Sequence, residues 1–360
     1  MTISTVSLRK ITLTIGILLS LALLFQLTYH TWYLGLPAPA STVHPTQITE
    51  TLVVAAAPTD DISWLAGHFP VRNVVSYRSS KGNEALAYLE YIVESYHDLP
   101  DIVIFIHNHD HAWHNARLFD FNMTRMLAHL DRKFVKDIGY FNLRCDWAPG
   151  CPARLRLRGS ATSGAAAANS TGRTIGNVDG SEEESREETV MKAVWGELHP
   201  GHPIPSTLAQ PCCSQFVASR ESIRAVPRQR WLHFRSWVLE TPLSNWFAGR
   251  VWEYTWQFVL AGDGVTTWCP LEKDCYCFGY GACFEGEDEW ENWKEAEEKA
   301  QAMRNDYITT ISGGDDGSKL KKELGTAEQE LQGMVKDSLR RGENERSSRD
   351  STRFEISHMP

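Results

Sequence analysis

Residues 81–115 constrain the fold more than any other stretch, because a helix pattern, a strand pattern and a histidine cluster follow one another there. Apolar residues recur at three- and four-residue steps through EALAYLEYIV (84–93), which predicts a helix with one apolar face. The run IVIFI (102–106) is apolar and rich in β-branched residues, as in strands buried on both faces of a sheet. HNHDHAWH (107–114) follows at once. Because ligands bind beyond the carboxyl ends of strands in open α/β sheets, we expect a site there.

Strand and helix patterns alternate along the rest of the chain. Strands are predicted over 51–57 and 71–77 and at the start of 213–221, where Ser219 or Ser222 would cap a following helix. Residues 139–145 are predicted to form a strand or a buried loop. Further helices are predicted over 119–136, 231–239 and 250–260. Such alternation is typical of βαβ units. The sequence therefore predicts an α/β fold with a mostly parallel central sheet flanked by helices.

The amino terminus carries an apolar run, ITLTIGILLSLALLFQLTY (11–29), of about the length that a bilayer core requires. Arg9 and Lys10 precede the run, and no Lys or Arg follows before Arg72. By the positive-inside rule this predicts a cytoplasmic tail (1–10), a transmembrane anchor (11–31) and a stem (32–50) leading into the secretory or Golgi lumen. The alternative is a signal peptide cleaved at Ala38-Pro39-Ala40.

A lumenal location bears on the eight cysteines and on two glycosylation sequons. In an oxidising compartment the cysteines are expected to form disulfides, in a pairing that the sequence leaves open. A zinc cluster around Cys275 and Cys277 is the alternative. The sequons begin at Asn122 and Asn169.

Two regions break the α/β pattern. Residues 159–190 are rich in Ala, Gly, Ser and Glu, and we expect a disordered insertion there within a lumenal domain of residues 51–284. Residues 285–360 are dominated by charged side chains and form a predicted tail, with solvated helices over 287–304 and 318–341. No chemistry is assigned to that tail.

Composition narrows the classes of partner. The formal net charge of −9 argues against nucleic acid, because phosphate binding requires a basic face. Thirteen tryptophans are many for 360 residues, and tryptophan offers a large apolar ring against which a sugar face can stack.

Several local motifs occur in one order: KGNEALAYLEYI (81–92), FIHNHDHAWH (105–114), GYFNLRCDWAPGCP (139–152), WEYTWQF (252–258) and CYCFGYGACF (275–284). In these motifs the chain resembles a fungal family of uncharacterised proteins, domain of unknown function 3431, over about residues 51–284. No activity comes with that resemblance. Members usually show Asn-Lys-Gly-Arg-Glu where this chain has SKGNE (80–84), so Gly82 and Glu84 match and the first and fourth positions do not.

The layout of short anchor, stem and lumenal α/β domain is also similar to that of Golgi nucleotide-sugar glycosyltransferases. That resemblance implies a divalent cation held at a strand end by an Asp-x-Asp motif, where this chain carries HNHD (107–110). It also implies an acidic residue on a late helix, acting as base or acceptor contact, and Glu253 is at that place.

Candidate metal ligands are His107, His109 and Asp110, with manganese or zinc as the metal, since imidazole suits these ions better than magnesium. In a strand His107 and His109 would share one face. The alternatives are a metal-free site contact, or a core histidine at 107 with His111 and His114 on a solvated loop.

The candidate catalytic residues are Glu84 and Glu253. Glu253 lies among aromatic residues, where burial would raise its pKa as a general base requires. Glu84 would contact a sugar hydroxyl or a histidine, or would only favour the dipole of its helix. The candidate substrate contacts are Arg144, which is suited to a phosphate or to a structural ion pair, together with His114, Trp113 and Trp256.

The function expected from these features is glycosyl transfer from a nucleotide sugar to a glycan or protein acceptor. A metal-dependent hydrolase built on the histidines and a non-catalytic glycan-binding or adaptor protein are the alternatives. The enzyme hypothesis, in which Glu253 is the acceptor base, requires that the histidines after residue 106 and Glu253 line one cleft.

Overall fold

The computed structural model describes residues 47–57, 59–67, 74–77, 81–152, 154–157, 181–262, 264–345 and 354–356. The predicted cytoplasmic tail and anchor, and the stem up to residue 46, lie outside this part of the chain. Among the residues that are described, none of the helices combines the length and apolar character needed to span a bilayer.

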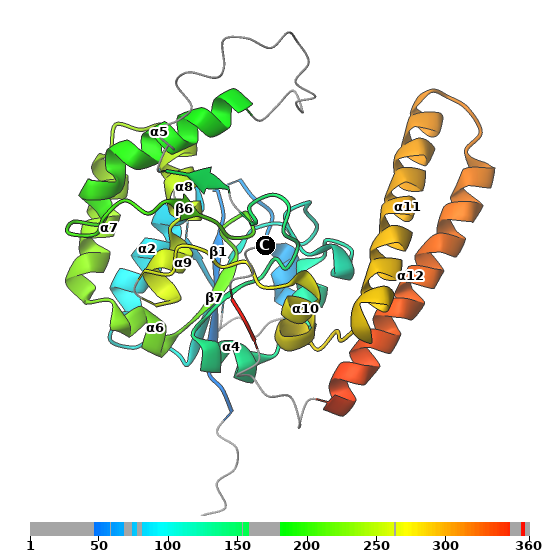
Figure 1. The fold of residues 1–360 in the computed structure, drawn as a ribbon, viewed down its shortest axis with the longest axis horizontal. Helices are drawn as coiled ribbons and strands as arrows, with labels where there is room; N and C mark the ends of the chain where they lie inside the picture. Colours follow the sequence, from blue (N-terminus) through cyan, green and yellow to red (C-terminus); the bar gives the residue numbers. More distant parts are fainter. Residues whose placement is uncertain are drawn as a thin grey trace, which may run out of the picture. The chain divides into compact units, whose positions relative to one another are not determined.

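A five-stranded sheet forms the centre of the fold, with the strand order β2-β1-β3-β7-β4 (Figure 1). The strands are β1 (Glu50–Ala55), β2 (Val74–Tyr77), β3 (Ile102–His107), β4 (Tyr140–Asn142) and β7 (Phe216–Ser219). β1 pairs in parallel with β2 and β3, whereas β7 is antiparallel to both of its neighbours, β3 and β4. The expectation of a mostly parallel sheet is therefore wrong, and the sheet is mixed.

The chain between β4 and β7 explains why β7 runs backwards. Leu143 donates its backbone N–H to Gln215 O, and the Asn142 amide donates to Pro211 O. Cys212 N–H likewise bonds to Pro149 O. These bonds hold the start of β7 at the edge of the sheet where β4 ends, so β7 must run back across the sheet. An apolar strand pattern carries no information on that direction.

Helices cover both faces of the sheet, and aromatic side chains make the contacts. On one face Tyr88 of α2 (Glu84–Ser95) and Trp256 of α9 (Trp256–Leu260) pack against Phe216, at ring-centroid distances of 5.8 and 4.9 Å. On the other face Phe134 of α4 (Arg132–Ile138) packs against Phe141 of β4. α10 (Glu272–Tyr280) joins that second layer, and α7 (Arg228–Glu240) packs beside α2.

Several predicted helices are confirmed, although two are divided. The helix predicted over 119–136 is η3 (Arg117–Phe119), α3 (Met123–His129) and α4, because Asp131 accepts the N–H of Phe134 and starts a new helix. Residues 250–260 contain the end of α8 (Asn245–Glu253) and then α9. Ser219 caps α6 (Arg220–Ala225) by accepting the N–H of Ser222. A short 3-10 helix, η1 (Ser63–Gly67), follows β1.

The predicted insertion is wrong over its last ten residues, because α5 (Ser181–Leu198) begins at residue 181. Met191, Val194 and Trp195 are buried, and they give this helix an apolar stripe that packs on the domain. Glu187 is also buried and pairs with Arg154 and Arg250, at 3.5 and 3.3 Å. A two-stranded sheet of β5 (Leu155–Arg156) and β6 (Thr207–Leu208) lies nearby in the chain. Residues 158–180 are outside the described residues.

Two long helices follow the central domain, α11 (Gly286–Ser312) and α12 (Ser318–Glu345), and they lie side by side as a hairpin (Figure 1). The helical expectation for 287–304 and 318–341 is confirmed. Trp290 and Trp293 of α11 are buried against Tyr276 of α10, at 5.8 and 6.4 Å between ring centroids. The hairpin is thus joined to the domain by an aromatic contact as well as by the chain.

All eight cysteines are paired, as expected, and the zinc alternative is wrong. The disulfides are Cys145–Cys275, Cys151–Cys269, Cys212–Cys213 and Cys277–Cys283. The Asn122 side chain is only 7% exposed and donates to Asp110, so the folded chain does not present this sequon to a glycosylating enzyme. Asn169 lies outside the described residues.

Candidate functional site

A cavity of about 380 Å³ opens at the carboxyl ends of β1 and β3, where the sequence predicts a site. We call it the histidine pocket. Its lining comprises Ala55, Ala56, Ala57, Asn83, Glu84, Ala87, His107, Asn108, His109 and His114. Strands β1 and β3 therefore form its floor, and the first turn of α2 forms a wall.

The turn into α2 depends on Gly82 and Asn83, which both have left-handed backbone angles, with φ of 64° and 53°. A Cβ atom on Gly82 would come within 2.8 Å of the Val238 side chain of α7. Glycine at 82 therefore serves both the turn and the close approach of α7. This geometry places the first residue of the helix, Glu84, in the pocket.

Three imidazoles contribute to the histidine pocket. His107 Nδ1 lies 3.2 Å from His114 Nε2, and the His109 ring, which is exposed, lies 6.5 Å from that of His114. Burial lowers the pKa of His107 to about 4, and burial together with the neighbouring His107 lowers the pKa of His114 to about 3. Both rings are therefore neutral near pH 7, which is the state that can ligate a metal or accept a hydrogen bond.

Glu84 faces these rings, with its Oε2 atom 4.0 Å from His107 Nε2. Burial raises the pKa of this carboxyl group, although a hydrogen bond from its own backbone and the charge of Arg250 act in the opposite direction. The His107 Nε2 atom is buried and has no hydrogen-bond partner. Because His107 is neutral, the contact with Glu84 is not an ion pair, and both groups have capacity left for a ligand.

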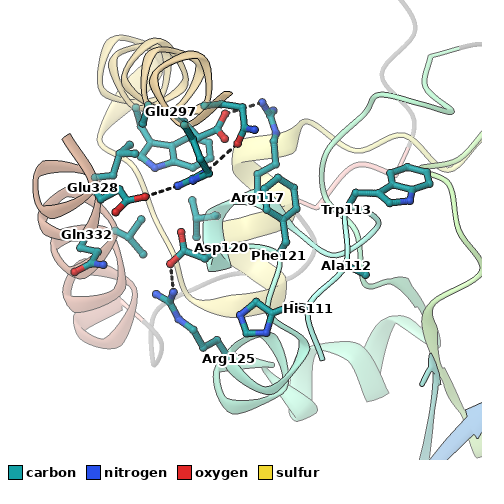
Figure 2. A pocket seen from close by; sticks show the side chains of 17 residues that line it. His111, Ala112, Trp113, Arg117, Asp120, Phe121, Arg125, Glu297, Glu328 and Gln332 are labelled. Carbon is teal, nitrogen blue, oxygen red and sulfur yellow. Dashed lines mark hydrogen bonds and ion pairs between the residues drawn. The ribbon is translucent and has the colours of Figure 1, made fainter. Parts of the chain in front are cut away.

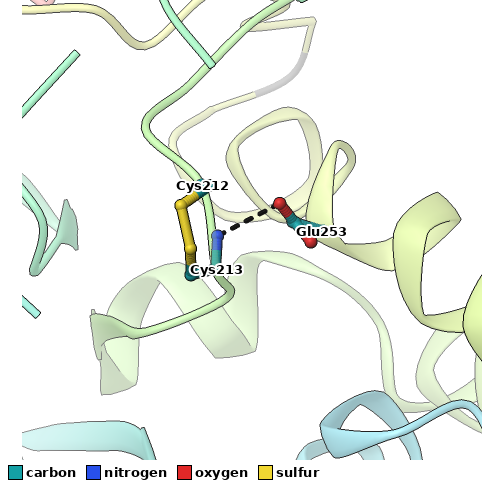
Figure 3. Close-up of side chains that lie close together, drawn as sticks. All are labelled: Cys212, Cys213 and Glu253. Carbon is teal, nitrogen blue, oxygen red and sulfur yellow. Dashed lines mark hydrogen bonds between the residues drawn. A yellow bond between two sulfur atoms is a disulfide. The ribbon is translucent and has the colours of Figure 1, made fainter. Parts of the chain in front are cut away.

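Glu253 does not line the histidine pocket. It is 6% exposed, accepts two bonds from Arg250 Nη1 at 2.9 and 2.7 Å, and accepts the N–H of Cys213 at 3.2 Å (Figure 3). Burial raises its pKa, and the charge of Glu84 does so too. The two carboxyl groups are therefore near enough to interact, but only Glu84 reaches the opening. The expectation that the histidines and Glu253 line one cleft is wrong, and so is the assignment of Glu253 as acceptor base there, because Arg250 and Cys213 hold its carboxylate elsewhere.

The sulfur atoms of Cys212 and Cys213 lie close to the Glu253 carboxylate, which is the kind of grouping that can hold a metal ion. Here both sulfurs are bonded to each other (Figure 3). Only thiolates are strong metal ligands, so this grouping does not fit an ion.

The structure does not bring Asp110 or Trp256 to the pocket. The Asp110 carboxylate accepts bonds from Thr124 N–H and from the Asn122 amide, and so holds the start of α3. Trp256 is fully buried between α2 and the sheet, so its ring offers no face to a ligand.

Arg144 and Trp113 lie beside the pocket, not in it. The Arg144 guanidinium is 5% exposed and donates to Trp113 O and Ala148 O, so it holds the loop after β3. The Trp113 ring is 64% exposed, and the guanidinium lies over it at 5.6 Å.

Sequence reasoning missed Asn108 and Gln215. Asn108 lines the pocket, and its carbonyl accepts the indole N–H of Trp64 at 2.8 Å. The Gln215 side chain accepts the backbone N–H of His107 at 3.0 Å and donates to Asn115 at 2.9 Å, which fixes the end of β3. Gln215 lies 108 residues from His107, so no local pattern reveals the contact.

A divalent cation could be held between His107 Nε2 and Glu84 Oε2, which are 4.0 Å apart. Two ligand atoms about 2.1 Å from a tetrahedral ion lie about 3.4 Å apart, so the two side chains would have to approach each other to hold one. An imidazole with one carboxylate suits manganese or zinc. The remaining ligands would have to come from a substrate or from water.

Residues 52–278 match a family described as a protein of unknown function, DUF3431. The chain belongs to the DUF3431 family. No match was found among curated proteins or among solved structures. The DUF3431 match covers β1 to α10 and hence the whole histidine pocket, and it ends before the α11–α12 hairpin.

Proposed function

We propose that this DUF3431 protein is a glycosyltransferase that binds a nucleotide-sugar donor in the histidine pocket. The observation that carries the proposal is the meeting of three imidazoles and the Glu84 carboxyl group in one cavity at the carboxyl ends of β1 and β3. Ligands of open α/β sheets bind at this edge. A mixed sheet with such a pocket is compatible with the glycosyltransferase layout, although fold alone does not decide function.

The pocket has groups for each part of a nucleotide sugar. The first turn of α2 opens into it, and backbone N–H groups at a helix N-terminus favour a diphosphate. His107 and Glu84 would hold a manganese or zinc ion, which when bound would neutralise charge on the leaving diphosphate. His109 and His114 would then contact the donor, and Asn108 offers an amide to a hydroxyl group.

When no ion is bound, Glu84 takes the catalytic role in this proposal, because a carboxylate that ligates an ion stays ionised and could not also carry the proton. Its raised pKa suits proton transfer with an acceptor hydroxyl, and it is the carboxyl group that reaches the cavity. Glu253 lies outside the cavity, where Arg250 and the N–H of Cys213 hold its carboxylate.

Calorimetric titration of the full chain with UDP- and GDP-sugars, with and without Mn²⁺, tests the donor site. Saturable binding is expected for at least one donor, lost in His107→Ala and weakened at least tenfold in Glu84→Gln. Glu94→Gln, an exposed position on the same helix, is the matched control and should bind normally. Absence of binding by every donor at millimolar concentration would overturn the proposal.

We further propose that the chain is a single-pass protein with its α/β domain in the secretory lumen. The four disulfides support this, because such bonds persist in oxidising compartments. In isolated microsomes the domain should resist protease until detergent is added. Digestion without detergent would place it on the cytoplasmic side and contradict the proposal.

A further inference from the structure

A second cavity, of about 620 Å³, lies between the loop that follows β3 and the α11–α12 hairpin (Figure 2). We call it the hairpin pocket. Residues between His111 and Arg125 form one wall, and residues between Trp293 and Val335 of the two long helices form the other. Its volume falls within the range of about 300–1,000 Å³ that is usual for small-molecule sites. The hairpin wall lies outside the DUF3431 match, so nothing in the family assigns it a role.

The charges in the hairpin pocket are balanced. Arg304 pairs with Glu328 at 2.7 Å, Arg117 pairs with Glu297 at 3.2 Å, and Arg125 pairs with Asp120. These three arginines and three carboxylates account for the Arg, Lys, Asp and Glu side chains that line the cavity. Figure 2 shows the pairs on both walls, around one shared space. An anionic ligand would therefore meet as many carboxylates as guanidinium groups and would gain little net attraction.

Trp113 gives the pocket its one large exposed aromatic surface, at 64% exposure. The Arg144 guanidinium lies over the ring, and Arg144 is itself held by the Trp113 and Ala148 carbonyl groups, so the ring has a supported position. The next residue, His114, lines the histidine pocket, and the two rings are 5.7 Å apart. The two cavities therefore meet at this dipeptide.

We propose that an uncharged oligosaccharide binds with one sugar ring stacked on Trp113 and with further sugar residues in the hairpin pocket. A sugar ring has apolar C–H faces that suit the indole, and its hydroxyl groups both donate and accept. Figure 2 shows the Trp113 ring pointing away from Glu328 and Gln332, so the paired side chains and the Gln332 amide are partners for those further sugar residues. If the donor occupies the histidine pocket, this carbohydrate is the acceptor, and that reading rests on the proposed function.

Binding of the carbohydrate itself does not rest on that function, and so it is measured without any nucleotide sugar. The full chain is applied to immobilised neutral oligosaccharides ending in mannose, galactose, glucose or N-acetylglucosamine, with sulfated oligosaccharides as the anionic comparison. A neutral glycan should be retained, and 0.5 M NaCl (about a 5 Å Debye length) should not remove it. Retention of sulfated glycans alone, or of no glycan, would overturn the proposal.

Variants of two exposed tryptophans locate the site. Trp113→Ala should weaken binding of the retained glycan at least tenfold, and Trp113→Phe should lose less. Trp246→Ala is the matched control, because Trp246 is also exposed and also lies beneath an arginine, Arg250, at 5.2 Å. Equal binding by Trp113→Ala and Trp246→Ala would place the glycan elsewhere.

Substitution of two glutamines of α12 tests whether the hairpin contributes to glycan binding. Gln332 lines the pocket, whereas Gln329 is exposed and does not. Gln332→Ala should weaken glycan binding about threefold or more, with Gln329→Ala unchanged. If the chain binds glycan but no nucleotide sugar, the proposed function is contradicted and this inference is not. If it binds a nucleotide sugar but no glycan, only this inference is contradicted.

Discussion

The histidine pocket and the hairpin pocket share the Trp113–His114 dipeptide, yet they hold their polar groups in opposite ways. In the histidine pocket burial keeps His107 and His114 neutral and raises the pKa of Glu84. In the hairpin pocket every arginine lies against a carboxylate. Buried groups without a charge partner can still form hydrogen bonds or metal bonds with a ligand. The paired groups already use their hydrogen-bonding atoms to hold the structure together.

That difference indicates different roles for the two pockets. Perturbed pKa values cluster at sites that move protons or bind metal ions, which favours chemistry in the histidine pocket. A charge-balanced wall with an exposed indole favours recognition of an uncharged ligand. The four predictions below test the comparison, from the largest effect to the smallest.

The largest expected effect concerns two long-range disulfides of the central domain. Cys145–Cys275 and Cys151–Cys269 link the region after β4 to α10 and to the residues before it, and they span 130 and 118 residues. With one of them intact, the other closes a loop of only about 12 residues, so removing either pair as Cys→Ala should cost about 3 kcal/mol. Removing both opens a loop of more than 100 residues and should cost about 8 kcal/mol. Urea unfolding measures each value.

The loss of stability on removing both disulfides should exceed the sum of the losses on removing each one alone, which is the test of the nested arrangement. Replacing Cys277 and Cys283, which are six residues apart, should cost about 2 kcal/mol whichever other pairs remain. Strictly additive losses for the two long-range disulfides would contradict the nested arrangement.

The second effect is an acid sensitivity of the histidine pocket. His107 and His114 have lower pKa values in the folded chain, about 4 and 3, than the ordinary value of 6.5. Between these limits the unfolded chain binds more protons, so stability is complete above pH 6.5 and is lost as the pH falls toward 4. We expect a loss of several kcal/mol from the pair, since each unit of pKa difference corresponds to about 1.4 kcal/mol, and urea unfolding with a chelator present measures it.

The double variant His107→Gln/His114→Gln should remove that part of the acid loss. His97→Gln, at an exposed position, should leave it intact. A residual loss is expected from His199, whose pKa burial lowers to about 3 at a distant place in the fold. An unchanged pH profile in the double variant would show that the two rings have the same pKa in the folded chain as in the unfolded one.

The third effect is a loss of stability with rising pH, whereas the two histidines lose stability with falling pH. Because burial raises the pKa of Glu84 above 4.5, its charged form costs stability, and the cost grows as the pH rises through the folded pKa. Glu84→Gln should therefore gain about 1 kcal/mol at pH 7 while donor binding falls. Differential scanning calorimetry at pH 7 and pH 4 checks this, and the gain should vanish at pH 4. Destabilisation at pH 7 would mean that Glu84 is a structural residue.

The smallest effect belongs to the hairpin pocket. The Arg304 and Glu328 side chains are about one-third exposed, so their pair should contribute only about 0.5 kcal/mol. A double-mutant cycle with Arg304→Gln and Glu328→Gln measures the coupling, which should shrink further in 1 M salt. A coupling above about 2 kcal/mol would contradict the contrast between the pockets, since it would mark a desolvated and strongly coupled pair.

Much of the central fold could be predicted from local patterns. The helix from Glu84, the strand from Ile102 and the capping by Ser219 each depend on residues close in the chain, and all three are confirmed. That the cysteines form disulfides was also predictable, from their even number and the expected compartment, whereas which cysteines pair was not. The helical start at residue 181 was missed, because low complexity before it concealed the apolar positions that follow.

The candidate site was predictable only in part. His107, His109, His114 and Glu84 share a cavity because both of their elements end at the same edge of the sheet, which is a property of α/β folds. Glu253 was placed in that cleft by its aromatic neighbours, but burial by itself does not tell which way a side chain faces. The hairpin pocket was not predicted at all, because the sequence of the two charged helices does not indicate which part of the domain they pack against.

The amino-acid sequence alone determined most of the helices and strands and the position of the histidines at the end of a strand, because periodicity and capping act over a few residues. Tertiary structure alone decided that β7 runs antiparallel, that Gln215 holds His107, and that Arg250 and Cys213 hold Glu253 away from the opening. Several of these contacts join residues tens to more than a hundred positions apart, and their energies depend on burial that exists only once the whole domain has folded.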